Sequence, residues 1–105
     1  MAPEILLNQK YGFPADIFAF GMILYELLSL QRPFFEERNA FKISQMIIEG
    51  KRPNVPESLG PEYATLVKLQ KKCVHAKPDR RPSLANCKSA LVKYILNSDT
   101  SFTNL

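Results

Sequence analysis

Residues 15–29 read ADIFAFGMILYELLS, and this stretch decides the fold. A helix formed here is apolar nearly all the way round, and such a helix must be covered on most sides by other protein. The nearly apolar run is about half as long as a membrane-spanning helix and contains Glu26, so it predicts a buried core helix. Gly21 lies in its middle, at a cost of roughly 1 kcal/mol. It indicates either the close approach of another backbone or a helix that simply tolerates glycine.

Glycine and proline divide the rest of the chain into three further helices. The second helix is capped by Asn39 and ends at Gly50. The third begins with Pro61, and the fourth is capped by Ser83. Their apolar residues recur at helical spacing: Ala40, Ile43, Met46 and Ile47, then Leu66, Leu69 and Cys73, then Leu84, Cys87, Leu91, Tyr94 and Ile95. No run alternates as a strand would, so the sequence predicts an all-α fold of four helices.

The length and composition fit one small domain. The chain has 105 residues, of which 46% are apolar and 23% charged, enough for a single core but not for two. We expect this domain to occupy residues 1–96. Residues 97–105, NSDTSFTNL, are polar and without a core-facing stripe, which predicts a disordered tail.

Charge and cysteine content narrow the function classes. The net charge of +4 is only mildly basic. The basic residues gather at Lys68, Lys71, Lys72, Lys77, Arg80, Arg81 and Lys88. No aromatic residues interleave them as a nucleic-acid platform requires, so a solvated helix face is favoured over a nucleic-acid site.

Cys73 and Cys87 are too few for a disulfide framework or a structural zinc site, and no secretory signal is visible at the N-terminus. We expect reduced thiols and a cytoplasmic or nuclear location.

Five motifs occur in a recognisable order. They are APE at 2–4, DIFAFG at 16–21, YELL at 25–28 with RPF at 32–34, IEGKRP at 48–53, and KPDRRPS at 77–83. Together they resemble the C-terminal part of a protein kinase catalytic domain, from the element that closes the activation segment to the end of the C-lobe. The methionine before APE and Cys73 before the RPS motif are typical of the tyrosine-kinase-like group. Phe18 and Val74 stand where that family usually has tryptophan.

The resemblance implies the four-helix lower half of a kinase C-lobe, from a parent that transfers the γ-phosphoryl group of ATP to a protein Ser/Thr or Tyr hydroxyl. Phosphoryl transfer needs a glycine-rich phosphate cover, a paired lysine, a catalytic aspartate and metal ligands. The sequence contains no V-A-I-K lysine, no H-R-D loop and no D-F-G. We therefore expect no catalytic, cofactor or metal ligands here and no activity from this chain alone, with ATP and magnesium belonging to the implied parent.

Three structural positions follow from the resemblance. Glu4 and Arg81 match a buried ion pair that anchors the activation segment, whereas the alternative is two exposed and unrelated charges. Arg80 is the neighbour that we expect to be solvated. Asp16 is a helix-start acid favoured by the helix dipole. In the family this aspartate also holds the backbone of the catalytic loop.

A docking surface is the remaining expectation. In kinases this region binds substrates and regulators, and here it contains Phe34, Phe35, Ile43, Met46 and Ile47. The pattern alone is more typical of core packing. The expected partners are the remainder of a kinase domain, protein substrates or regulators, and other copies of this chain. The alternative function is a non-catalytic helical interaction module.

Overall fold

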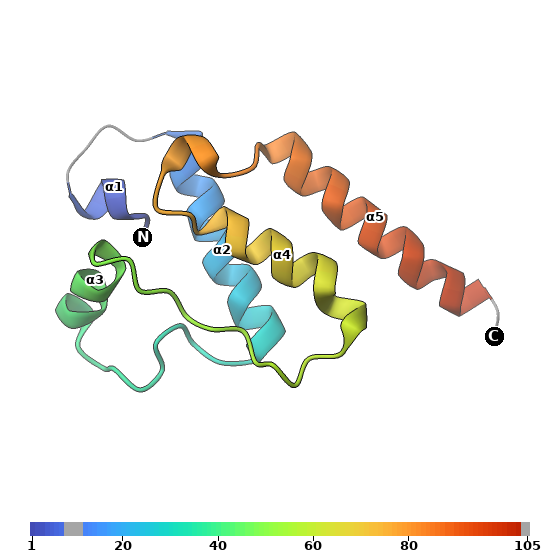
Figure 1. Cartoon of the computed structure of the whole chain (residues 1–105), viewed down its shortest axis with the longest axis horizontal. Helices are drawn as coiled ribbons and strands as arrows, with labels where there is room; N and C mark the ends of the chain where they lie inside the picture. Colours follow the sequence, from blue (N-terminus) through green and yellow to red (C-terminus); the bar gives the residue numbers. More distant parts are fainter. Residues whose placement is uncertain (8–11, 104–105) are drawn as a thin grey trace.

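The computed structural model describes the backbone of residues 1–7 and 12–103 and the side chains of residues 1–7 and 12–96. This part of the chain contains only helices and loops (Figure 1). The elements are α1 (Pro3–Leu6), α2 (Phe13–Ser29), α3 (Ala40–Ile48), η1 (Pro61–Tyr63), α4 (Ala64–Cys73), η2 (Pro78–Arg80) and α5 (Leu84–Thr103). The all-α prediction is confirmed. The short helix α1 and the 3₁₀ turn η2 were not expected from the sequence.

Local capping signals set the helix starts. The Asn39 carboxamide oxygen accepts hydrogen bonds from the backbone N–H groups of Phe41 (2.9 Å) and Lys42 (3.3 Å). The Ser83 hydroxyl accepts one from Asn86 N–H at 3.1 Å. Each cap satisfies donors that the first helical turn leaves free. Pro61 begins the turn η1, which leads directly into α4.

The last helix is longer than the sequence predicts. Helix α5 continues to Thr103, whereas a disordered tail was expected from residue 97. No glycine or proline follows Leu96, so nothing in the backbone stops the helix. Each added residue then contributes a further hydrogen bond to the helix already formed. The side chains beyond residue 96 lie outside the described part of the chain.

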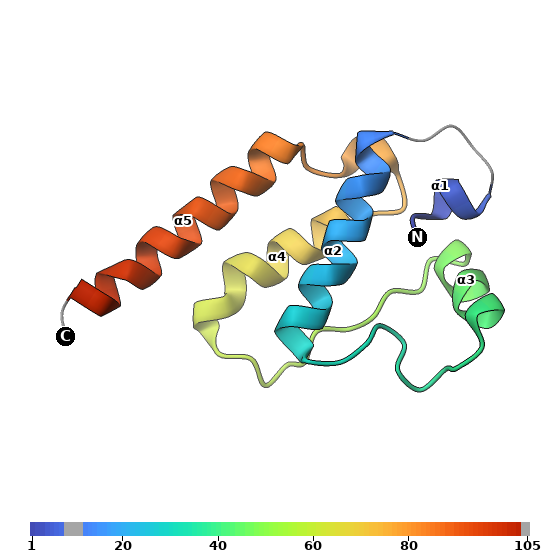
Figure 2. The same ribbon diagram turned by 180° about the vertical axis from the view of Figure 1, so that it is seen from behind.

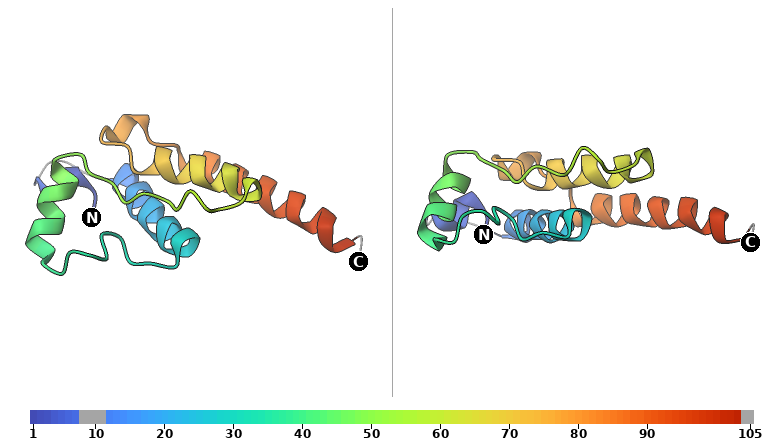
Figure 3. Two further views of the ribbon diagram at one scale, coloured as in Figure 1. Left: turned by 60° about the horizontal axis from the view of Figure 1, so that its bottom comes forward. Right: turned by 90° about the horizontal axis from the view of Figure 1, so that it is seen from below.

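The helices form a thin, two-layered slab. Helices α2 and α5 lie in one layer, and α4 lies in the other, where it crosses α2 and runs alongside α5 (Figures 2 and 3). The Cα atoms extend over 50 × 30 × 14 Å, and 14 Å leaves room for little more than these two layers. None of the helices within the described ranges is both long and apolar enough to cross a membrane.

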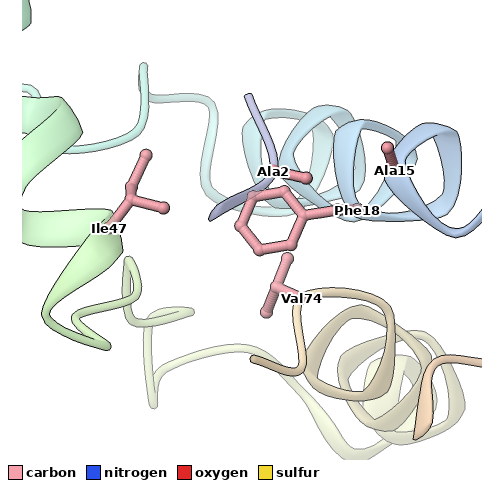
Figure 4. Close-up of a cluster of buried hydrophobic side chains, with 5 residues drawn as sticks. All are labelled: Ala2, Ala15, Phe18, Ile47 and Val74. Carbon is pink, nitrogen blue, oxygen red and sulfur yellow. The ribbon is translucent and has the colours of Figure 1, made fainter. Parts of the chain in front are cut away.

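Helix α2 contributes to two buried clusters. The first consists of Ala2, Ala15, Phe18, Ile47 and Val74 (Figure 4). The second consists of Ile17, Leu24, Leu69, Cys73 and Cys87. Because α2 supplies side chains to both, it is the central helix of this fold, as its apolar sequence predicts.

The two cysteines join α4 to α5 by packing. Both thiols are free and buried, with 3.9 Å between their sulfur atoms. Burial, and then the neighbouring Cys87, raise the pKa of the Cys73 thiol to about 12. Cys73 is therefore protonated at neutral pH and packs as a small apolar side chain.

Gly21 marks the point where α2 and the end of α4 are closest. A Cβ atom at this position would lie 2.7 Å from Cys73 Cβ and 2.8 Å from Val74 Cγ1. Both distances are too short for non-bonded carbon atoms. The glycine therefore serves a close approach, although the crowding atoms belong to the Cys73 and Val74 side chains and the nearest backbone atom, Cys73 C, is 3.5 Å away.

We expect Gly21→Ala to lower the free energy of unfolding by about 1–2 kcal/mol, because overpacking outweighs the gain in helix propensity. Gly12→Ala is the matched control, since a Cβ at Gly12 meets nothing within 4 Å. Urea unfolding followed by circular dichroism measures both variants. Equal midpoints for the two variants would contradict this account of the α2–α4 contact.

Candidate functional site

A buried ion pair joins the beginning of the chain to its last third. Arg81 Nη1 donates to Glu4 Oε2 at 2.6 Å and Arg81 Nη2 donates to Glu4 Oε1 at 3.0 Å. Glu4 lies in the single turn α1 and Arg81 directly follows η2, so two short elements present the two side chains. Both residues are buried. The structure thus brings together the two charges that the resemblance pairs, in a two-pronged geometry.

The Arg81 guanidinium also holds two backbone segments. Its Nε donates to the carbonyl of His75 at 2.8 Å, and its Nη1 donates to the carbonyl of Pro14 at 2.9 Å. One side chain therefore connects α1, the start of α2 and the loop after α4. Arg80, by contrast, is exposed, as expected.

A second arginine, Arg52, was not identified as a site residue from the sequence. Its Nε donates to Val74 O at 2.7 Å, and its Nη1 donates to Ile47 O at 3.0 Å and to Lys51 O at 2.8 Å. Its Cζ lies 5.0 Å from the centre of the Phe18 ring, and Arg81 Cζ lies 4.9 Å from the same centre. Both distances fit cation–π contacts. Arg52 belongs to the IEGKRP motif, which was the available signal for its importance. The motif did not show which groups the arginine would contact.

The electrostatics of this cluster favour the ionised form of Glu4. Burial alone would raise the pKa of Glu4, but the hydrogen bonds and charge of Arg81 outweigh it, so the pKa of Glu4 lies below its ordinary value. Burial, and then the like charge of Arg81, lower the pKa of Arg52. Glu4 is therefore ionised at neutral pH and balances one of the two arginines.

Asp16 lies apart from this cluster. It is exposed in the first turn of α2, and its carboxylate forms no ion pair or hydrogen bond within the described residues. Its position fits the favourable helix-dipole interaction expected of a helix-start acid. The described residues offer no contact that assigns it a further role.

The expected docking residues divide into two groups. Ile47 is buried in the first core cluster and Ile43 packs against that cluster. Phe34, Phe35 and Met46 instead line an open pocket of about 540 Å³ beside the end of α2. Phe34 belongs to both environments, because it also packs against the core.

We expect Arg81→Ala to lower the free energy of unfolding by roughly 3–5 kcal/mol, because it leaves the Glu4 carboxylate buried without a partner. Arg80→Ala should change it by less than about 0.5 kcal/mol, as an exposed substitution. Arg81→Lys keeps the charge but loses the two-pronged geometry, so an intermediate loss is expected. Urea unfolding at one protein concentration compares the three, and equal midpoint shifts for the two alanine variants would refute the assignment.

Comparison with known proteins identifies the family in which these motifs occur. The family model for protein tyrosine and serine/threonine kinases matches residues 1–91. The chain is 42% identical over 83 residues to the serine/threonine-protein kinase/receptor R818 of Acanthamoeba polyphaga mimivirus, covering 79% of this chain and 5% of that protein. It is 33% identical over 93 residues to a LIM domain-containing serine/threonine-protein kinase of Dictyostelium discoideum, covering 89% and 9%. It is 35% identical over 86 residues to the serine/threonine-protein kinase drkB of the same organism, covering 82% and 12%.

The chain spans only a small part of these relatives, between 5% and 12% of their length. The tyrosine-kinase-like subgroup stays a prediction, because the relatives are named as serine/threonine kinases. The family match nevertheless covers most of the chain, including Glu4, Arg81 and the docking residues. The chain therefore belongs to the protein tyrosine and serine/threonine kinase family, as a fragment of the kinase catalytic domain.

Proposed function

We propose that this chain supplies the scaffold and a docking surface of a kinase C-lobe, in a parent that phosphorylates serine or threonine hydroxyl groups of proteins. The observation that carries the proposal is the buried, two-pronged Glu4–Arg81 ion pair, which ties the APE motif to the RPS motif. The names of the relatives favour serine or threonine over tyrosine. A cytoplasmic or nuclear location is part of the same proposal.

In this proposal the residues that the structure describes provide no site for ATP and magnesium. Phosphoryl transfer needs clustered metal ligands and a glycine-rich cover over the phosphates. The described residues contain no group of three or more His, Cys, Asp or Glu side chains that could hold a metal ion. The four glycines, Gly12, Gly21, Gly50 and Gly60, are widely separated in the sequence. In this proposal the nucleotide and metal are therefore held by other parts of the parent kinase.

A second candidate function is a helical interaction module, and one observation favours it. Ile23, Leu27 and Leu30 are spaced four and three residues apart, so they share one side of α2 and its C-terminal cap. They are 57%, 69% and 88% exposed. An apolar strip of this kind is typical of a surface that another protein segment covers. In the kinase proposal that segment is the remainder of the kinase domain.

The purified chain should transfer no phosphate from ATP to a generic protein substrate, with incorporation equal to that of a boiled control.

A chimera tests the scaffold role directly. In it, residues of this chain replace the 83 matching residues in the kinase domain of R818. If that unmodified domain phosphorylates the substrate, the chimera should do so as well. A chimera that unfolds cooperatively but is inactive would contradict the scaffold proposal, as would activity of the isolated chain.

The isolated chain should self-associate or bind a hydrophobic dye, because burial of each large apolar side chain is worth roughly 1.5–3 kcal/mol. Light scattering and dye fluorescence measure this. Ile23→Lys combined with Leu27→Lys should reduce both signals, whereas Phe41→Lys, at an exposed position of α3, should not. A monodisperse wild-type monomer that unfolds sharply and binds no dye would show that the exposed strip needs no cover.

A further inference from the structure

The pocket beside the end of α2 is lined by both apolar and polar side chains. Four segments line it: the end of α2, the loop after it, α3 and the loop after α3. Its volume of about 540 Å³ lies in the range of ligand-binding pockets. The lining residues are Tyr25, Gln31, Phe34, Phe35, Glu36, Glu37, Met46, Arg52, Pro53 and Asn54. An aromatic and methionine surface of this kind adapts to large apolar side chains.

Two carboxylates line this pocket, and the nearby Arg32 guanidinium is directed to backbone, since its Nη2 donates to Phe35 O at 3.3 Å and to Glu37 O at 3.4 Å. Neither Glu36 nor Glu37 forms an ion pair within the described residues, although Glu37 Oε1 accepts a hydrogen bond from Asn39 N–H at 3.0 Å. Arg52 is the one cation among the lining residues. Three of its hydrogen bonds go to backbone carbonyls and its guanidinium lies over Phe18, so its charge is already engaged. Two carboxylates that form no ion pair within the described residues therefore line this pocket, in a chain whose net charge is +4.

The backbone at Phe34 is a second, independent observation. Its φ of 53° lies in the left-handed region, which is costly for a residue other than glycine. Such conformations persist only where surrounding contacts hold them, and they concentrate at functional sites. Here the Phe34 ring packs against the core while also lining the pocket. The next residue, Phe35, remains 49% exposed at the pocket's edge.

We propose that this pocket binds a peptide segment in which arginine or lysine adjoins a large apolar side chain. The apolar side chain packs between Phe34, Phe35 and Met46, and the cationic side chain pairs with Glu36 and Glu37. The side-chain amides of Gln31 and Asn54, which form no hydrogen bonds within the described part of the chain, are available to the peptide backbone. This inference rests on the proposed docking function and specifies the kind of peptide that would bind there. An acidic or phosphorylated segment is disfavoured by the same carboxylates.

Fluorescence anisotropy tests the proposal with the full chain and three labelled peptides that share one leucine. One peptide carries two arginines beside the leucine, one carries neutral citrullines there, and one carries glutamates. The arginine peptide should bind at least about three times more tightly than the citrulline peptide, and the glutamate peptide should bind most weakly. Raising the salt concentration from about 50 to about 300 mM should reduce the difference between the first two.

Matched variants locate the site. Glu36→Gln combined with Glu37→Gln should weaken binding of the arginine peptide about three- to tenfold. Glu57→Gln combined with Glu62→Gln changes the net charge equally outside the pocket and should leave binding unchanged. Phe35→Ala should weaken binding about tenfold. Phe41→Ala removes an equally large, exposed ring that does not line the pocket, and it should have no effect.

The proposal is overturned by any of three results. These are equal affinity for the arginine and citrulline peptides, equal losses for the two glutamine double variants, or no binding at about 1 mM peptide. The outcome is separable from that of the kinase proposal. An active chimera with no peptide binding would refute only the docking inference, whereas selective peptide binding with a folded but inactive chimera would refute only the scaffold.

Discussion

The guanidinium of Arg81 is the contact on which the rest of this structure depends. A buried arginine costs several kcal/mol in lost hydration, and only good geometry with further hydrogen bonds offsets that cost. Arg81 has both, since it forms two bonds to Glu4 and two more to the carbonyls of His75 and Pro14. These partners come from three separate parts of the chain. Losing the side chain would therefore release α1, the start of α2 and the loop after α4 together.

The Phe18 ring connects this cluster to a fourth segment, the loop after α3, because Arg52 of that loop lies over the ring. The ring is fully buried, and both Arg52 and Arg81 lie over it at about the same distance. Burial, and then repulsion between the two like charges near this ring, lower the pKa of Arg52. Glu4 neutralises one charge, and the three carbonyls that accept from Arg52 stabilise the other. The aromatic ring at residue 18 thus matters for its electron-rich face as well as for its volume.

The features that could be predicted from the sequence are those set by neighbouring residues or carried by the family motifs. Asn39, Pro61 and Ser83 each act on the helix that begins beside them, so their roles could be assigned from neighbouring residues. The Glu4–Arg81 pair crosses most of the chain and could be named only because the motifs fixed both positions. Arg52 lay within an identified motif, yet its bonds to Val74 and Ile47 depend on how α3 and α4 meet. Helical spacing likewise showed that Ile47 and Met46 are apolar positions, but not that one is in the core and the other in a pocket.

Arg52 also places the anchoring contacts beside the proposed docking pocket. It touches the Phe18 ring on the core side and lines the pocket on the other. Because its hydrogen bonds fix it to three backbone carbonyls, this wall of the pocket is positioned by the same contacts that hold α3 and α4 together. Among the other lining residues, Phe35 and Glu36 are exposed, whereas Glu37 is half-buried and accepts a hydrogen bond from Asn39 N–H. The proposed pocket thus combines an arginine fixed by backbone carbonyls with an exposed ring and an exposed carboxylate, a combination that suits one apolar side chain beside variable charged residues.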